Sequence, residues 1–184
     1  IHSLPASVKD GIQVVFGHSV YYGIHEHFSR PARYITFLRE PVSQVISHYE
    51  YFLHHYDSLI ADQPSRGYPK DKSELTFDRC RPLFTVNMQI PTVLNYAING
   101  RIGVNGDVDI NEAHLERAKQ ILDKYYFVGL LESFEEDSLF LYDELGIRRF
   151  IRKPQNVARK KHLHVDEVLK QEIRSAVTLD LRLY

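Results

Sequence analysis

Cysteine, glycine and proline are all scarce in this chain of 184 residues, which has one cysteine, nine glycines and eight prolines. A single cysteine, Cys80, cannot form an intrachain disulfide, so nothing indicates an oxidising compartment. The low glycine and proline content excludes a collagenous or low-complexity chain. No run approaches the roughly 18 apolar residues of a membrane span, and residues 1–5 lack the features of a signal peptide. We therefore expect a soluble chain without a membrane segment.

The length of 184 residues fits one domain of ordinary size. Hydrophobic residues make up 43% of the chain and charged residues 26%, which are globular averages and exclude disorder as the main state. These residues alone favour a reducing, cytoplasmic location. The Golgi lumen stays open as an alternative if a leader or membrane anchor precedes residue 1.

Charge is unevenly distributed, although the formal net charge is only −1. Residues 107–144 carry eleven acidic and three basic side chains, whereas residues 147–161 carry seven basic side chains and no acidic one. A basic run of this kind is usually a solvated face, but it also attracts ligands that bear phosphate or sulfate. Because the chain is near neutral overall and has no recognition motif for DNA or RNA, we expect no nucleic-acid partner.

Segments with strand character alternate with segments of helical periodicity. Short β-rich runs predict strands at 13–16, 34–38 and 125–130, and apolar spacing predicts helices over 41–53, 111–122 and 165–177. Ser133 and Glu136 form a Ser-x-x-Glu pattern that predicts a capping box for a further helix, which Gly146 is placed to end. Residues 57–77 predict a long loop. This order is typical of an α/β sandwich around a mainly parallel sheet.

The most informative stretch runs from Tyr34 to Tyr49. A buried strand delivers Arg39 to its carboxyl end, where ligands bind in open α/β sheets, and Pro41 is placed to start a helix. We expect Arg39 to stand beside free N–H groups at the start of that helix and to grip an anion together with Ser47. The residues alone leave a structural alternative open, in which Arg39 caps a carbonyl or pairs with a carboxylate and Ser47 bonds back to its own helix.

This stretch resembles the Arg-Asp-Pro-x-x-Arg-x-x-Ser-x-Tyr signature of the PAPS-dependent sulfotransferase superfamily. PAPS is the nucleotide that donates the sulfuryl group, and PAP is the nucleotide product. The resemblance implies that Arg39 and Ser47 contact the 3′-phosphate of the donor and that Tyr49 closes the motif. Two positions differ from the signature, because Glu40 stands where Asp is usual and Gln44 stands where a second Arg often lies.

Further similarities extend over most of the chain. The sequence Phe16-Gly17-His18 resembles the histidine-bearing loop of carbohydrate sulfotransferases related to heparan sulfate 2-O-sulfotransferase, which implies that His18 is the general base for a hydroxyl acceptor, most naturally a carbohydrate. A histidine suits this task because its ordinary pKa of about 6.5 leaves much of it neutral at physiological pH. Similar correspondences lie at 87–89, 127–134 and 179–184.

The resemblance also implies a P-loop-like three-layer fold whose first strand and helix enclose a phosphate-cradling loop. No Gly-Lys-Ser/Thr or comparable run opens this chain. We therefore expect residues 1–184 to form a single sulfotransferase-like domain that is amino-terminally incomplete, and this segment alone to be inactive. Two alternatives stay open, namely a kinase-like nucleotide phosphotransferase and a noncatalytic anion-binding module of the same fold.

Two further groups of residues bear on ligands. Arg159, Lys160 and Lys161 are the candidates in the basic run for holding the donor nucleotide or an anionic sugar acceptor. Short histidine pairs such as His25-x-His27 suggest a metal, but structural zinc sites usually add cysteine ligands in a tighter pattern, and Cys80 has no such partner. We therefore expect no metal site. The identity of the acceptor and the oligomeric state stay open.

Overall fold

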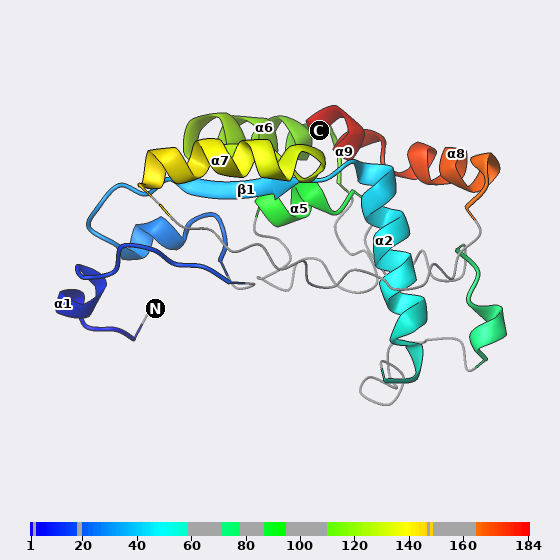
Figure 1. Ribbon diagram of the computed structural model, residues 1–184, viewed down its shortest axis with the longest axis horizontal. Coiled ribbons are helices and arrows are strands. Elements are labelled where there is room, and N and C mark those ends of the chain that lie inside the picture. Colours follow the sequence, from blue (N-terminus) through cyan, green and yellow to red (C-terminus); the bar gives the residue numbers. More distant parts are fainter. Residues whose placement is uncertain are drawn as a thin grey trace.

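The computed structural model describes residues 1, 3–17, 20–58, 71–77, 87–94, 110–146, 148 and 165–184. In this part of the chain, helices surround a two-stranded parallel sheet (Figure 1). The helices and strands are, in chain order, α1 (Ala6–Lys9), β1 (Tyr34–Leu38), α2 (Pro41–His54), α5 (Gln89–Val93), α6 (Glu112–Tyr125), β2 (Tyr126–Leu130), α7 (Phe134–Leu145), α8 (Glu167–Ala176) and α9 (Thr178–Leu183). Short 3-10 turns lie at η1 (Ile24–His27), η3 (Lys72–Glu74) and η5 (Leu131–Ser133). The expectation of an α/β fold with parallel strands is confirmed at this coarse level.

The two faces of the sheet are covered by different helices. Because side chains alternate along a strand, the consecutive residues Phe37 and Leu38 point to opposite faces. Leu38 belongs to the same buried cluster as Leu122 of α6, whereas the ring centroid of Phe37 lies 4.7 Å from that of Phe134 at the start of α7. Figure 1 accordingly shows α7 in front of β1 and α6 behind it. The approach of α7 is close, since a Cβ added at Gly129 would lie 3.2 Å from the Cβ of Asp137 on that helix.

Among the described residues, most buried hydrophobic side chains belong to one of two separate clusters. The α2–α8 core consists of Val42, Val45, Tyr49, Phe52, Tyr56, Leu75, Phe77, Ile173 and Val177. The α5–α6 core consists of Leu38, Ile90, Val93, Leu115, Ala118, Ile121 and Leu122. Leu38 ends β1 inside the α5–α6 core, and Val42 in the first turn of α2 lies inside the α2–α8 core, so residues 39–41 cross from one core to the other. This crossing holds Arg39 between two packed units.

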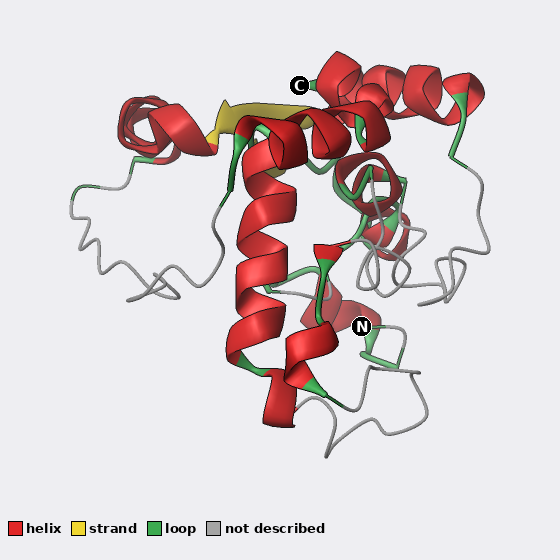
Figure 2. Ribbon diagram, turned by 90° about the vertical axis from the view of Figure 1, so that its right-hand side faces the viewer, coloured by secondary structure: helices red, strands yellow, loops and turns green. Residues whose placement is uncertain are grey.

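Helix α2 follows the predicted pattern. It starts at Pro41, whose missing N–H would have no partner in the first turn of a helix. Val42, Val45, Tyr49 and Phe52 recur at helical spacing and are all buried. Burial of each such side chain contributes about 1.5–3 kcal/mol, which exceeds the small differences in helix propensity. Figure 2 shows α2 running away from the sheet, so only its first turns lie near the end of β1.

Residues 13–16 do not form the predicted strand. Their backbone is irregular, and the side chains of Val14 and Phe16 are 74% and 90% exposed. A β-rich run becomes a strand only where a neighbouring strand takes up its N–H and C=O groups, and no described strand lies alongside these residues. The local composition was therefore insufficient to predict the element.

Helix α7 ends as predicted but does not begin as predicted. Gly146 adopts the left-handed conformation, with a φ of 67°, and terminates the helix. Ser133 forms no capping box, because its hydroxyl donates to Oδ2 of Asp137 at 2.8 Å. The same oxygen accepts the N–H of Leu130 at 2.6 Å, so Asp137 joins β2 to α7.

Two other expectations concern exposure. Val168 of α8 is 66% exposed and does not belong to the predicted buried stripe, whereas Ile173 of the same helix is fully buried. Of the predicted loop at 57–77, residues 57–58 and 71–77 are described, and Leu75 and Phe77 there pack into the α2–α8 core.

Among the described segments, no helix has both the length and the apolar character needed to cross a membrane.

Candidate functional site

Arg39 lies at the carboxyl edge of the sheet, between the last residue of β1 and the start of α2. Ligands of open α/β sheets bind at this edge. Its side chain is half-buried. Ion pairs in the described ranges involve Arg33, Lys119, Lys170 and Arg182, and within those ranges the Arg39 guanidinium has no carboxylate partner. A half-buried cation that has no counter-charge among the described residues is suited to binding an anionic ligand.

The carboxylate of Glu40 occupies the amino end of α2. Its Oε1 accepts the N–H of Val42 at 3.1 Å, and its Oε2 accepts the N–H of Ser43 at 2.7 Å. Burial acts to raise the pKa of Glu40, but the hydrogen bonds from Ser43 and Val42 outweigh burial and hold that pKa below its usual range. The prediction that Arg39 stands beside free helix N–H groups is therefore wrong, because the Glu40 side chain accepts hydrogen bonds from those groups.

A second carboxylate meets the same edge from η5. The main-chain N–H of Glu40 donates to Oε1 of Glu132 at 2.9 Å, and the hydroxyl of Tyr184 donates to Oε2 of Glu132 at 3.2 Å. Arg39 is thus flanked by acidic groups that do not contact its guanidinium. An anion held at Arg39 must be bound against this negative charge, which lowers the affinity that the guanidinium alone would give.

The main chain of Arg39 is held from α5. Nε2 of Gln89 donates to the carbonyl of Arg39 at 2.8 Å, and the N–H of Arg39 donates to Oε1 of Gln89 at 3.3 Å. Asp180 of α9 accepts the N–H groups of Gln89 at 2.9 Å and Ile90 at 3.1 Å. The N–H of Asp180 in turn donates to Oδ1 of Asn87 at 3.0 Å. This network ties two other parts of the chain, residues 87–90 and α9, to the residue that carries the charge.

Sequence reasoning assigned no role to Gln89 or Asp180. The only signal was the family correspondence at 87–89 and 179–184, which in this structure are the two segments that the network joins. Asp180 is almost fully buried, and burial raises its pKa to about 6 although the N–H groups of Gln89 and Ile90 act to lower that pKa. Hydrogen bonds of Asp180 therefore link residues 87–89 to residues 179–184 in the folded chain.

Ser47 and Tyr49 have different environments on α2. Ser47 is half-buried, and its hydroxyl forms no hydrogen bond within the described part of the chain, either to Arg39 or back to its own helix. Tyr49 is buried, and its hydroxyl donates to the main-chain carbonyl of Leu75. Tyr49 thus closes the motif as a core residue that joins α2 to residues 71–77, while the Ser47 hydroxyl has no hydrogen-bond partner among the described residues.

Four predicted site residues lie outside the described residues. These are His18, Arg159, Lys160 and Lys161. Their predicted roles, as general base and as nucleotide or acceptor contacts, stay predictions.

His25 lies at the other end of β1 from Arg39. Its Nδ1 is 2.6 Å from the hydroxyl of Tyr34, the first residue of that strand. Tyr34 and Arg39 are five positions apart along extended chain, a distance of about 17 Å. His27 pairs with the hydroxyl of Tyr21 at 3.3 Å. The described residues contain no group of three histidine, cysteine or acidic side chains that would hold a metal ion.

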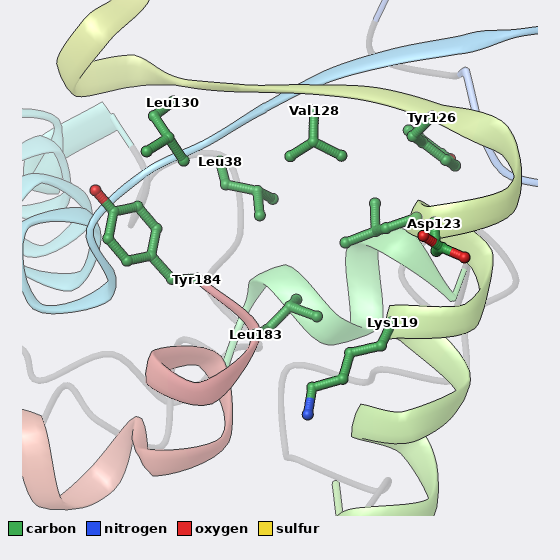
Figure 3. A pocket seen from close by; sticks show the side chains of 9 residues that line it. Leu38, Lys119, Asp123, Tyr126, Val128, Leu130, Leu183 and Tyr184 are labelled. Atoms are coloured by element: carbon green, nitrogen blue, oxygen red, sulfur yellow. The ribbon is translucent and has the colours of Figure 1, made fainter.

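An open groove of about 380 Å³ lies between α6, β2 and the end of α9 (Figure 3). It is lined by Leu38, Lys119, Leu122, Asp123, Tyr126, Val128, Leu130, Leu183 and Tyr184. Tyr184 also donates to Glu132, whose other oxygen accepts the N–H of Glu40, so hydrogen bonds connect one wall of the groove to the Arg39 edge. Apolar walls with a few polar groups are typical of small-molecule sites in general.

No protein-family model, curated protein or solved structure matches this chain. The chemistry proposed for the site therefore rests on its residues, on its geometry and on the resemblance of residues 39–49 to the donor-binding signature.

Proposed function

We propose that this chain is a PAPS-dependent sulfotransferase domain with a P-loop-like fold, which transfers a sulfuryl group to a hydroxyl of a carbohydrate. One observation carries the proposal. The half-buried Arg39 guanidinium stands at the carboxyl end of a parallel strand, directly before a helix, with no carboxylate partner among the described residues. The sequence from Arg39 to Tyr49 at this place has the spacing of the donor-binding signature.

Arg39 and Ser47 are the residues that would hold the 3′-phosphate of the donor. The guanidinium supplies charge-assisted hydrogen bonds worth about 1.5–3 kcal/mol, and the Ser47 hydroxyl adds a neutral donor. Because Glu40 occupies the N–H groups of Val42 and Ser43, the affinity comes from these side chains and not from the amino end of α2.

The reaction needs a base for the acceptor and positive charge for the leaving group. PAPS supplies the sulfuryl group when bound and leaves as PAP. The oxygen of the acceptor hydroxyl bonds to sulfur as the bond from sulfur to the phosphate oxygen breaks. His18 takes the hydroxyl proton, which typically accelerates such a step by about 10²–10⁴-fold. Arg159, Lys160 and Lys161 contribute positive charge for the donor nucleotide or for an anionic sugar.

Calorimetry and a transfer assay on the full-length protein test this proposal. We expect PAP to bind and radiolabelled sulfate to pass from PAPS to a carbohydrate acceptor. Binding of ATP with phosphate transfer supports the kinase-like alternative instead. Binding of PAP without transfer to any hydroxyl supports the noncatalytic module. A full-length protein that does not bind PAP overturns the proposal.

A further inference from the structure

We propose that Gln89 is the residue that positions Arg39 for anion binding, because its side-chain amide holds both main-chain hydrogen-bonding groups of Arg39. This inference rests on the proposed function, in which Arg39 contacts the phosphate of the donor. The two bonds measure 2.8 Å from Gln89 Nε2 to the Arg39 carbonyl and 3.3 Å from the Arg39 N–H to Gln89 Oε1.

The contact replaces a strand partner that Arg39 lacks. The ladder between β1 and β2 ends where Leu38 lies opposite Leu130, so Arg39 is one residue beyond the paired strands. A primary amide presents one donor and one acceptor side by side, as a neighbouring strand would. Gln89 therefore extends the pairing of β1 by the one residue that carries the charge.

Two bonds to the same residue fix the direction of its side chain. The N–H and the C=O of Arg39 belong to the peptide groups on either side of its Cα atom. When both groups are held, the Cα–Cβ bond has one direction, and the guanidinium samples a smaller region. Such preorganisation strengthens binding because less conformational freedom is lost when the anion arrives.

Gln89 is itself held by Asp180. Both residues are buried, at 4% and 1% relative exposure. Asp180 accepts the N–H groups of Gln89 and Ile90, which lie at the start of α5, and so fixes the backbone from which the Gln89 side chain extends. Arg39 is thereby supported by α9 through α5, and not only by its own strand.

Burial makes Gln89 a positioning residue and not a ligand of the anion. Its acceptor oxygen and one amide hydrogen are engaged with Arg39, and 4% exposure leaves little room for a second contact. Its substitution should therefore act through Arg39. A loss of PAP affinity that depends on the presence of Arg39 therefore distinguishes positioning from a general loss of stability.

A double-mutant cycle in the full-length protein tests the inference by PAP calorimetry. Gln89→Asn keeps a neutral amide but is one methylene too short to reach Arg39, and we expect about tenfold weaker PAP binding. In the Arg39→Ala background the same change should alter PAP affinity by less than about twofold. Thr92→Ala is the matched control, because Thr92 is an exposed residue of the same helix whose hydroxyl donates to the Met88 carbonyl at 2.7 Å. Unchanged PAP affinity in Gln89→Asn, or an equal loss in both backgrounds, overturns the inference.

Hydrogen exchange followed by NMR gives a readout that needs no ligand. In Gln89→Asn and Gln89→Met, the Arg39 amide should exchange at least about tenfold faster while amides inside β1 keep their rates. Faster exchange throughout β1 would indicate general destabilisation, and an unchanged Arg39 rate would show that Gln89 does not hold this residue. A parent protein that fails to bind PAP refutes the proposed function, and the exchange rates then decide alone whether Gln89 positions Arg39.

Discussion

Glu40 accepts the N–H of Ser43 at 2.7 Å and so places a carboxylate at the amino end of α2, immediately after Arg39 in the chain. This carboxylate has two opposite effects. It stabilises α2 by capping N–H groups that have no partner within the helix, and it adds negative charge where an anionic ligand would bind. The stability of α2 and the affinity of the site for an anion are therefore in competition.

Glu40→Gln separates the two effects. The amide oxygen still accepts one helix N–H, so we expect a loss of at most about 1 kcal/mol of stability in urea unfolding. Removal of the charge should tighten PAP binding by about fivefold at low ionic strength, and less in high salt. Glu116→Gln removes an exposed carboxylate of α6 and should change neither quantity. Weaker PAP binding in Glu40→Gln would show that the carboxylate helps to hold the ligand.

Arg39→Ala should weaken PAP binding about tenfold or more, because it removes the charge-assisted hydrogen bonds to the 3′-phosphate. Arg33→Ala is a suitable control, since Arg33 is 86% exposed and pairs with Glu144 at 3.2 Å. Calorimetry should detect no change in PAP affinity for that control. If PAP binds Arg39→Ala as tightly as the parent, with both proteins folded by circular dichroism, Arg39 is not the phosphate contact.

His18→Ala should separate binding from chemistry. A base that acts on the acceptor does not contact the donor, so PAP affinity should stay near that of the parent while turnover falls by about 10²-fold or more. His25→Ala serves as the comparison, because His25 contacts Tyr34 at the opposite end of β1 and should keep its turnover when the protein is folded. Parental turnover in His18→Ala would exclude His18 as the base.

Local patterns predicted the elements that depend on local interactions. The β-rich run at 34–38, Pro41 at the start of α2 and Gly146 at the end of α7 all have physical causes within a few residues. The strand expected at 13–16 failed because a strand also needs a partner, and local composition does not reveal one. The side chain that caps α2 was likewise missed, since Glu40 was considered only as a departure from the family signature.

Local patterns of this kind could not predict the hydrogen bonds that hold Arg39. Asp180 accepts the N–H of Gln89 from a position 91 residues away in sequence, and Gln89 reaches Arg39 across 50 residues. No periodicity, cap or turn signal encodes contacts of that range. They arise because α5 and α9 pack beside the end of β1, which only the folded chain reveals.

The pKa of Asp180 makes the stability of the protein depend on pH in a specific direction. Burial raises this pKa to about 6, whereas a carboxyl in an unfolded chain titrates near pH 4. The folded state therefore holds the proton more tightly than the unfolded state. The resulting contribution is complete below about pH 4 and is lost as the pH rises to about 6, with a magnitude of up to about 3 kcal/mol.

Asp180→Asn removes this titration, so the free energy of unfolding of the parent minus that of the variant should fall as the pH rises from about 4 to about 6. Urea unfolding at several pH values measures this difference. Carboxylates with lowered pKa, such as Glu40, make stability rise with pH, but they are present in both proteins and cancel in the subtraction. A difference that stays constant between about pH 4 and 6 would show that Asp180 titrates as it does in an unfolded chain. In that case its two N–H hydrogen bonds would offset the effect of burial completely, and the link from α9 to Arg39 would be insensitive to pH.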